Sequence, residues 1–575
     1  MGDRPNVTMS RERMLVLVVL ALALTVGVGC IVASWDKPIV GDLIVYSWWA
    51  RGALETGVTG AVFNPDEGLY PGNLHAPTYS YLLAAGFGLF GDRPRSAILV
   101  NLACFGATLA LLRALARRLS PAPEIAVWMT WTLVLVHPFS LQSVLLTDTD
   151  TTLVPVAILG YSLVLLRNLD RMSPRRVMLL GLVFSACLWS KFTTPLILPA
   201  MTMLFFLLRG QIVGGIRDTA IITATGAAGY VVTDYIFSRV TGLAPFAAVG
   251  VASGKFQDQL GTQLAAKLGN MMATLKTDFV WLGLPFVILV ALALVERAQR
   301  YARERSVHDA DFIAVLAVST YVVYTVAVPT GGIPRYKSVT FPLFALLVGD
   351  LLARLLARAT VSWRAVATAV AVTALTAWYY AGLPEIVLTA TELSAREPSA
   401  SPKLALVAAF ALPVVGLAAV AAVVWRRLDR RAIAWACVVV LAPLAVVTDV
   451  KQARAEGPSN FFGIGQTGFR DTVVYLKTHA RRDEMFFSYK DVPYYTRNQY
   501  YLYFRYAGSR RAVDLDRLAP ILERRNVGWW IIEDSPVRFG DVTFDAPARA
   551  FLDRNFVPAA AFGEFRIYRR RVVAR

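Results

Sequence analysis

The apolar run at residues 14–34 reads MLVLVVLALALTVGVGCIVAS and contains no charged residue. A helix needs roughly 20 predominantly apolar residues to cross a bilayer, so this run is long enough to do so. Similar runs recur to about Val450 in a chain of 575 residues, of which 56% are hydrophobic and 17% charged. The composition predicts an all-α polytopic membrane protein. It excludes a secreted disulfide scaffold, a disordered protein and an ordinary cytosolic enzyme.

Apolar runs bounded by charged residues predict about thirteen transmembrane helices. They lie near residues 14–34, 96–112, 122–146, 151–166, 177–190, 195–208, 219–237, 279–295, 311–328, 339–353, 365–383, 404–425 and 432–449. The runs 177–190 and 195–208 are short for full crossings. They form either two thin helices broken at Lys191 to Pro195 or one long tilted helix. An even number of spans would invert the orientation of everything downstream.

Arginine placement predicts the orientation, because short cytoplasmic loops collect Lys and Arg. With the amino terminus inside, 23 arginines fall in about 74 cytoplasmic residues, in segments 1–13, 113–121, 167–176, 209–218, 296–310, 354–364 and 426–431. An odd number of spans then places residues 451–575 on the outer face. The net charge of +18 is therefore a topology signal and gives no reason to expect a nucleic-acid partner.

The chain divides into a transmembrane module, residues 1–450, and an outer domain, residues 451–575. The outer domain alternates patterns typical of helices and strands. We expect helices over 469–480, 515–525 and 546–555 and strands over 484–489, 527–533 and 561–569. This alternation predicts a small α/β domain on the exoplasmic surface.

The first outer loop, residues 35–95, is far longer than most loops in compact proteins, and long ordered loops usually carry function. It contains Asp42 directly after the first span, then a helix-like stretch over 46–55 that includes Arg51, and later His75. Trp and Tyr residues in this stretch are typical of a helix lying along the membrane surface. Asp42 is either a functional carboxylate or the cap of that helix.

A second acidic point is Asp148-Thr149-Asp150, at the predicted outer junction of two spans. Carboxylates beside hydrocarbon are costly unless they face a wet cavity or a partner. An Asp-x-Asp pattern can hold a divalent ion such as Mg or Mn through oxygen ligands, and the alternative is a polar turn that caps the next span.

Two cations, Lys191 and Arg335, also lie at predicted outer ends of spans. They could bind a phosphate, and the alternative is snorkelling to lipid headgroups. The coincidence of acids and bases from distant segments on one membrane face favours a site. The sequence contains no Walker loop, glycine-rich dinucleotide turn, nucleophile elbow or zinc signature.

Several short motifs resemble, in the same order, those of the GT-C membrane glycosyltransferases, specifically the dolichyl-phosphate-mannose-protein mannosyltransferase and aminoarabinose-transferase-like group. They are Asp42 with Ala50-Arg51, His75-Ala76-Pro77-Thr78-Tyr79 with Leu89-Phe90-Gly91, Leu146-Thr147-Asp148, Ser190-Lys191-Phe192-Thr193, and Arg335-Tyr336 before Phe341-Pro342. Two departures stand out. Asp42 lacks the adjacent second acid that is frequent in this group, and Ala76 replaces a proline.

The resemblance implies a glycosyltransferase of a bacterial inner membrane, with a cytoplasmic amino terminus. It would transfer one sugar from a polyprenyl-phosphate donor to a lipid, protein or polysaccharide acceptor on the outer face, with inversion at the anomeric carbon. It implies Asp42 as general base. The substrate-binding residues would be Arg51, His75, Asp148 or Asp150, Lys191, Arg335 and Tyr336. The sequence leaves open the sugar, the acceptor, a metal requirement and which of the two aspartates acts.

Rival interpretations are a secondary transporter, a lipid or polysaccharide flippase and a non-enzymatic scaffold. Transporters favour paired repeats and charged groups near the membrane midplane. The sequence has no convincing repeat, and most of its notable charges lie at the ends of predicted spans.

Overall fold

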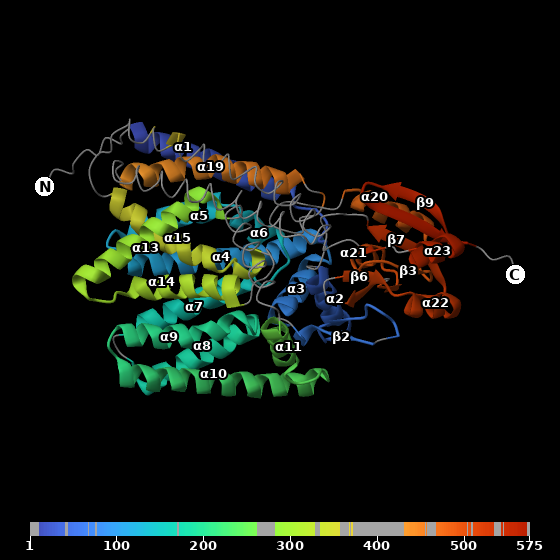
Figure 1. Ribbon diagram of the computed structural model, residues 1–575, viewed down its shortest axis with the longest axis horizontal. Coiled ribbons are helices and arrows are strands. Elements are labelled where there is room, and N and C mark those ends of the chain that lie inside the picture. Colours follow the sequence, from blue (N-terminus) through green and yellow to red (C-terminus); the bar gives the residue numbers. More distant parts are fainter. Residues whose placement is uncertain are drawn as a thin grey trace.

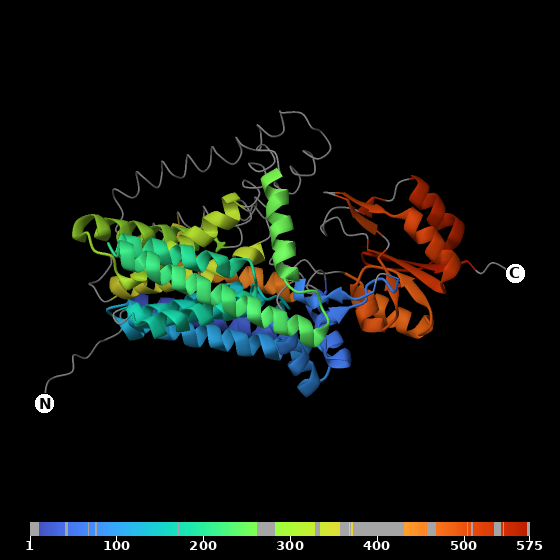
Figure 2. The same cartoon turned by 90° about the horizontal axis from the view of Figure 1, so that it is seen from below.

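The computed structural model describes residues 11–571 except 41–43, 67, 75–76, 170–171, 262–281, 328–333, most of 357–429, 455, 457–466, 503, 508–509, 534–541 and 544–545. Figure 1 shows an elongated body of helices with a smaller α/β domain at one end. Figure 2 shows that most helices run along the length of the body, whereas α11 (Ala247–Gly261) lies across it.

Helices occupy the predicted spans that fall within the described residues. They are α1 (Arg11–Ala33), α4 (Pro94–Leu119), α5 (Pro123–Val136), α6 (Phe139–Leu145), α7 (Leu153–Asn168), α8 (Pro174–Ser190), α9 (Ile197–Leu208), α10 (Ile212–Thr241), α13 (Leu284–Glu304), α14 (Asp309–Val322), α15 (Thr340–Leu356) and α19 (Arg430–Arg454). The predicted spans 365–383 and 404–425 lie almost wholly outside the described residues.

By length and composition, three described helices can each cross a membrane: Pro94–Leu119, Ile212–Thr241 and Arg431–Arg454. The pair α5 and α6 makes a fourth candidate and is bent by 64°. The bend falls at His137 and Pro138, where proline lacks the N–H that would continue the helix. The total of about thirteen spans stays a prediction.

Residues 177–208 form two helices, which answers the question that the sequence left open. Helix α8 ends at Ser190, a short 3₁₀ turn, η4 (Thr194–Leu196), follows, and α9 then begins at Ile197. Pro195 lies inside the turn and has no N–H with which to continue a hydrogen-bonded helix through this point. Lys191 caps the carboxyl end of α8 in an extended conformation.

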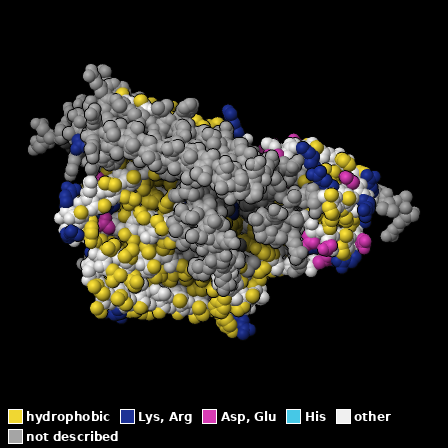
Figure 3. All heavy atoms as spheres, in the orientation of Figure 1, with side chains coloured by type: hydrophobic (Ala, Val, Ile, Leu, Met, Phe, Trp, Pro, Cys, Tyr) yellow, Lys and Arg dark blue, Asp and Glu magenta, His cyan; other side chains and the backbone are white. Residues whose placement is uncertain are grey.

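Glycines let several of these helices pack closely. A Cβ atom on Gly349 of α15 would lie 2.1 Å from Oγ1 of Thr130 on α5, and one on Gly226 of α10 would lie 2.3 Å from Cδ1 of Phe184 on α8. Small residues at such crossings let backbones approach, which is the usual basis of helix association in membranes. Figure 3 shows hydrophobic side chains over much of the described surface of the body, whereas charged side chains appear mostly at its far end and over the α/β domain.

Loops predicted to be cytoplasmic meet at that end. Arg118 and Arg209 lie 2.8 and 3.7 Å from the carboxylate of Asp309. Arg167, in the last turn of α7, lines the same open cleft as Arg118. Segments that are distant in sequence, and that the arginine pattern predicts to be cytoplasmic, thus converge at one end of the body.

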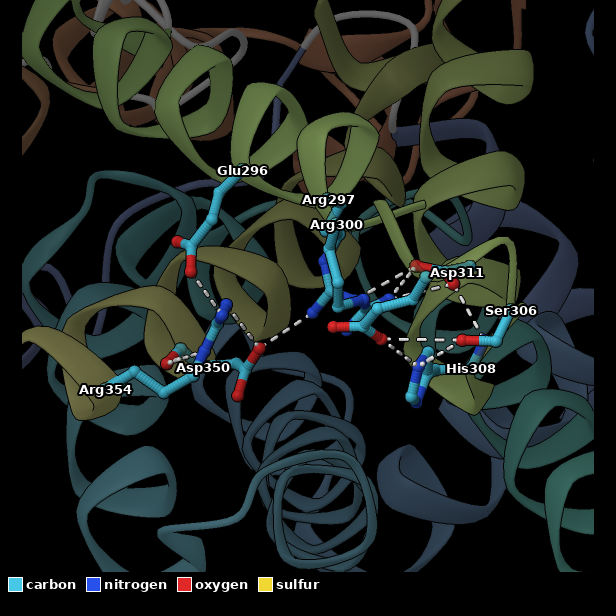
Figure 4. Close-up of polar contacts among 9 residues, drawn as sticks. Glu296, Arg297, Arg300, Ser306, His308, Asp311, Asp350 and Arg354 are labelled. Atoms are coloured by element: carbon cyan, nitrogen blue, oxygen red, sulfur yellow. Dashed lines mark hydrogen bonds and ion pairs between the residues drawn. The ribbon is translucent and has the colours of Figure 1, made fainter. Parts of the chain in front are cut away.

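A buried charge network also lies at this end, between α13, α14 and α15 (Figure 4). The guanidinium of Arg297, whose side chain is 5% exposed, lies 2.8 Å from the carboxylate of Asp350 and 3.3 Å from that of Asp311. Arg354 bridges Asp350 at 3.0 Å to Glu296 at 2.5 Å. Removing one member of such a network leaves an uncompensated buried charge.

The substitution Asp350→Ala is therefore expected to destabilise the protein by ~3–5 kcal/mol, because Arg297 loses its shortest ion pair. Glu124→Ala is the matched control, because Glu124 pairs with Arg117 in a contact where both side chains are largely exposed. Such exposed pairs contribute at most ~1 kcal/mol. Thermal unfolding of the two detergent-solubilised variants measures both losses of stability. Equal shifts in melting temperature would contradict a stabilising role of the buried network.

The α/β domain contains a mixed five-stranded sheet of order β4-β3-β7-β10-β9, with β3 parallel to β4 and β7 and the other pairs antiparallel. Its elements are α20 (Phe469–His479), β3 (Met485–Phe487), α21 (Asp491–Thr496), β4 (Tyr500–Tyr501), α22 (Leu515–Arg524), β7 (Val527–Glu533), α23 (Ala546–Asn555), β9 (Phe556–Phe562) and β10 (Phe565–Arg570). A second, three-stranded sheet has the order β5-β6-β8 and comprises β5 (Phe504–Ala507), β6 (Arg510–Val513) and β8 (Val542–Thr543).

The predicted elements of this domain are confirmed, with one correction. The single strand expected over 561–569 is a hairpin of β9 and β10, turning at Gly563 with φ of 51°. Successive side chains of central strand β7 point to opposite faces. Trp529 and Trp530 are accordingly both buried, but in different hydrophobic clusters.

The long first outer loop is also structured. The predicted surface helix is α2 (Ile44–Thr56), and a short ribbon of β1 (Gly60–Ala61) and β2 (Tyr70–Pro71) follows it. An apolar helix that the sequence prediction missed, α3 (Pro77–Phe90), completes the loop. Figure 1 shows these elements between the helical body and the α/β domain.

Candidate functional site

The candidate site lies where three segments meet at the domain end of the helical body. They are the loop 146–152 between α6 and α7, the cap of α8 at Lys191, and the 3₁₀ turn η6 (Pro334–Lys337). Each of these segments adjoins the end of a helix. The packed helices therefore determine where the polar residues of each segment lie. The sequence predicted a site from these segments, and the structure brings them into contact.

Hydrogen bonds hold the acidic loop in a tight turn. Asp150 donates its backbone N–H to Oδ1 of Asp148 at 3.1 Å, and the Thr152 hydroxyl donates to the Asp148 carbonyl at 2.6 Å. Thr149 donates its hydroxyl to the carbonyl of Ser190 at 2.9 Å, which ties the loop to the end of α8. Aspartate and threonine side chains favour such local bonds to the backbone. The loop is buried throughout, since residues 147–152 are at most 4% exposed.

Each aspartate of the loop is paired with one cation. Lys191 Nζ donates a hydrogen bond to Asp150 Oδ1, and Arg335 Nε lies 3.5 Å from Asp148 Oδ2. Both cations face the ring of Tyr336, at 4.8 Å from its centroid for Lys191 Nζ and 5.3 Å for Arg335 Cζ. A cation within about 6 Å of an aromatic face is attracted by its quadrupole. We call Asp148, Asp150, Lys191, Arg335 and Tyr336 the charged cluster.

Burial and neighbouring charges set the protonation states of the cluster. Burial, followed by the charge of Asp150, raises the pKa of Asp148 to about 6, although Arg335 and Lys191 act in the opposite direction. Burial lowers the pKa of Lys191, but the carboxylate of Asp150 more than compensates, so the pKa lies above its ordinary value. Lys191 is therefore a cation at physiological pH, and Asp148 titrates close to it.

The described contacts of the two aspartate side chains include ion pairs with Lys191 and Arg335. Within the described part of the chain, no group of three or more His, Cys, Asp or Glu side chains is placed to hold a metal ion. Because one or two carboxylates, with water and substrate phosphate, are enough to hold Mg²⁺, the metal site stays a prediction of the sequence.

An aromatic contact and several hydrogen bonds connect the charged cluster to α2 and α3. The ring of Tyr46 on α2 lies edge-on to Tyr79 on α3 at 5.3 Å, and Tyr79 donates its hydroxyl to Asn101 Oδ1 at 2.7 Å. Asn101 in turn donates to the carbonyls of Val144 and Leu146 at 2.9 Å each, directly before the acidic loop. The amino-terminal end of α3 also touches α8, because Thr78 donates its hydroxyl to the carbonyl of Trp189 at 2.9 Å.

The electrostatics of Tyr46 agree with these contacts. Burial raises the pKa of its hydroxyl well above the ordinary value, and the carboxylates of Asp148 and Asp150 raise it further. The ring contact of Tyr46 with Tyr79, and the bonds from Tyr79 through Asn101 to Leu146, place α2 beside the acidic loop. The sequence prediction missed Tyr46, Tyr79 and Asn101 as parts of the site. Asn101 could have been singled out from the sequence, because a polar residue inside an apolar span often marks a functional site.

Two predicted site residues, Asp42 and His75, lie outside the described residues. Their described chain neighbours are Val40 and Ile44 around Asp42, and Leu74 and Pro77 around His75. Arg51, predicted as a substrate-binding residue, lies elsewhere: its Nε atom donates to Asp92 Oδ2 at 2.8 Å, and its guanidinium lies 3.6 Å from the ring of Tyr494 in the α/β domain. These contacts give Arg51 a role in joining the loop to that domain.

Comparison with known proteins supports the same architecture. No curated protein matches the sequence. Residues 74–233 match the family described as dolichyl-phosphate-mannose-protein mannosyltransferase. ArnT from Cupriavidus metallidurans bound to undecaprenyl phosphate is similar in structure, with a TM-score of 0.55 and 15% identity over 97% of this chain and 98% of its own. The structure of apo ArnT from the same organism has a TM-score of 0.52 and 14% identity, again over 97% of this chain and 98% of its own.

The chain has the GT-C fold. The family match and the fold together indicate a membrane glycosyltransferase. A third similar structure, arabinosyltransferase EmbB from Mycobacterium smegmatis, gives a TM-score of 0.43 and 16% identity over 81% of this chain and 44% of its own.

The match to the mannosyltransferase family contains much of the candidate site. It spans the acidic loop with Asp148 and Asp150, and it includes Lys191. It stops before η6, so Arg335 and Tyr336 lie outside the matched residues.

Proposed function

We propose that this GT-C protein transfers one sugar from a polyprenyl-phosphate-linked donor to an acceptor hydroxyl on the outer face of the membrane. The observation that carries the proposal is the charged cluster, which gathers two cations at the end of a lipid-embedded bundle. A polyprenyl-phosphate donor places its tail in the bilayer and its phosphate at this depth. ArnT, whose fold is similar, was solved with undecaprenyl phosphate bound.

In the proposed reaction, the Asp42 carboxylate accepts the proton of the acceptor hydroxyl. The acceptor oxygen then forms a bond to the anomeric carbon of the sugar. The bond between that carbon and the phosphate oxygen breaks, and its electron pair leaves with the polyprenyl phosphate. Attack opposite to the leaving group inverts the anomeric configuration.

Lys191 and Arg335 would stabilise the leaving phosphate, whose negative charge grows in the transition state. Cations aimed at developing charge in a site that excludes water contribute strongly to catalysis. In the described structure these cations pair with Asp150 and Asp148. The phosphate would therefore share or replace these partners, while the two carboxylates keep the cations positioned before the donor arrives.

The pH dependence of donor binding is expected to report on Asp148. Above about 6 its carboxylate is ionised and competes with the donor for Arg335, whereas below its pKa of about 6 it is neutral and releases the guanidinium. The phosphodiester of the donor keeps one negative charge over this range. Donor affinity should thus rise ~3- to 10-fold as the pH falls from 7.5 to 5.

Asp148→Asn removes the titration, so its donor affinity should be constant over the same range. Equilibrium binding of a fluorescent donor to protein in nanodiscs measures both curves. A wild-type dissociation constant that does not change with pH would contradict this role of Asp148.

The function itself is tested by supplying purified protein in nanodiscs with polyprenyl-phosphate donors that carry radiolabelled sugars, together with a membrane extract as acceptor. The proposal expects the label in an acceptor and one polyprenyl phosphate released for each sugar transferred. Movement of intact donor across a proteoliposome membrane without any transfer would favour a flippase or a transporter and refute the proposal.

A further inference from the structure

We propose that a cleft between α4 and α7, at the end of the helical body away from the α/β domain, binds the headgroup of an anionic phospholipid, with a preference for one that carries two phosphates. The inference goes beyond the proposed sugar transfer, because no residue of the cleft belongs to the charged cluster. We call this site the arginine cleft. Its lining residues are Ala110, Arg113, Ala114, Arg117 and Arg118 of α4 and Arg167 of α7.

The shape of the arginine cleft follows from the periodicity of α4. Residues 110, 113, 114 and 117 have the spacing i, i+3, i+4 and i+7, which places them on one face of a helix. The short alanine side chains on this face leave space between the longer arginine side chains. Helix α7 packs against α4 and supplies Arg167 from its last turn. The cleft has a volume of about 600 Å³, which lies within the usual range for ligand sites.

Two of the four arginines are paired with carboxylates. Arg117 lies 2.8 Å from the carboxylate of Glu124, and both side chains are largely exposed. Arg118 lies 2.8 Å from the carboxylate of Asp309, which also lies 3.7 Å from Arg209. Asp309 is therefore shared between two guanidinium groups and compensates the charge of Arg118 only in part.

The other two arginines supply the excess charge of the cleft. Arg113 and Arg167 are exposed and form no ion pair with any residue that the structure describes. Four arginines less two carboxylates leave a charge of +2. Guanidinium groups bind phosphate oxygens in bidentate fashion. A headgroup with two phosphodiesters, each of charge −1, therefore matches the charge of the cleft.

Tryptophans of α5 place the cleft at the level of the lipid headgroups. Trp128 is 61% exposed, and its ring lies edge-on to that of Trp131 at 6.0 Å. Trp131 donates its indole N–H to the carbonyl of Leu109 on α4 at 2.9 Å. Exposed tryptophan on a membrane helix is typical of the interface between hydrocarbon and headgroups. Arg113 follows Leu109 by about one helical turn toward the end of α4, so the arginines lie where lipid phosphates are expected.

The surroundings of the cleft favour a lipid over a soluble anion. The same face of α4 continues toward the middle of the helix with Ala103, Gly106 and Ala110, all of them exposed. A Cβ atom on Gly106 would meet no other atom within 4 Å. The acyl chains of a lipid held at the cleft would lie along this open apolar strip, from which a soluble phosphate gains nothing. Basic pockets between membrane helices on the cytoplasmic side bind phospholipid headgroups in this way.

The test is the double variant Arg113→Gln with Arg167→Gln, which removes the two charges without a described partner and keeps long polar side chains. Native mass spectrometry of protein released from phosphatidylcholine nanodiscs with a minor fraction of cardiolipin measures how tightly cardiolipin is held. Each arginine beside anionic headgroups contributes ~5-fold, so the double variant should bind cardiolipin ~25 times more weakly than the wild type. Phosphatidylglycerol, which has one phosphate, should bind the wild type more weakly than cardiolipin does, and equal binding would overturn the preference for two phosphates.

Arg175→Gln is the matched control. Arg175 is exposed in the first turn of α8, on the same predicted face of the membrane, and does not line the cleft. Its variant should bind cardiolipin with the wild-type affinity. The double variant breaks no described ion pair, so it should melt at the wild-type temperature in phosphatidylcholine alone. If it does not fold, the two single variants replace it, and each should lose ~5-fold in cardiolipin affinity.

The remaining outcomes decide between the occupants. Equal cardiolipin binding by the wild type, the double variant and the control would overturn the inference and leave the arginines a role in orienting the chain alone. Displacement of cardiolipin from the wild type by micromolar inorganic pyrophosphate would assign the cleft to a soluble anion and also overturn it. The measurement needs no sugar transfer, so it decides the arginine cleft whether or not the proposed function holds.

Discussion

Replacing Lys191 with methionine is expected to lower kcat for sugar transfer by ~10²- to 10³-fold, the usual cost of removing one group that stabilises developing negative charge. Of the two cations in the charged cluster, Lys191 lies nearer to its aspartate partner, Asp150, and nearer to the ring of Tyr336. Methionine keeps the length and the apolar stem of lysine but not its charge, so the packing beside Tyr336 is largely preserved.

The single substitution leaves Asp150, whose side chain is 5% exposed, without its partner and will also destabilise the protein. The double variant Lys191→Met with Asp150→Asn removes both charges and keeps the volumes. It should unfold within a few degrees of the wild type and still show the full loss of transfer. A double variant that is folded and transfers sugar at the wild-type rate would show that Lys191 has no role in the reaction.

Asp42→Asn is expected to lower kcat by ~10²- to 10⁴-fold, which is the typical contribution of a general base. The amide has nearly the same shape as the carboxylate but cannot accept the acceptor's proton. The donor phosphate is held by other segments, so polyprenyl-phosphate binding should match that of the wild type.

Asp36→Asn is a control for this prediction, because Asp36 lies in the same stretch after α1 and has no assigned role in the reaction. It should transfer sugar at the wild-type rate. Steady-state kinetics of the three proteins with one labelled donor make the comparison. If Asp42→Asn retains wild-type kcat, another residue is the base.

The positions of the site segments could be predicted from sequence because membrane helices place their ends on one of two surfaces. Asp148, Lys191 and Arg335 are each separated by spans whose number and charge pattern set the surface. Once the surface is fixed, few places remain where charged residues can meet. The structure pairs Arg335 with Asp148 and Lys191 with the neighbouring Asp150, which extends that prediction to atomic detail.

Other features depend on side-chain geometry that periodicity does not encode. The pairing of each aspartate with one particular cation depends on the turn formed by Thr149 and Thr152. The contacts of Arg51 likewise depend on side-chain geometry. Its place in a motif suggested a substrate contact, but its guanidinium group bonds to Asp92 and Tyr494. No sequence pattern links residue 51 to residue 494.

Some local elements escaped prediction for reasons of length. Helix α3 has 14 residues, too few for a span, and its apolar sequence is equally typical of a loop segment buried under a domain. The β9–β10 hairpin turns within two residues, Gly563 and Glu564, inside what reads as one extended run. A positive φ at a glycine allows such a tight turn without interrupting the pattern of the flanking strands.

The central claim is that the charged cluster binds the phosphate of a polyprenyl lipid. A structure of the protein in nanodiscs with polyprenyl phosphate tests it most directly. We predict phosphate oxygens at ~3 Å from Lys191 Nζ and from the guanidinium of Arg335, with the lipid tail leaving along the helical body. A phosphate bound elsewhere, with both ion pairs of the cluster unchanged, would contradict the claim.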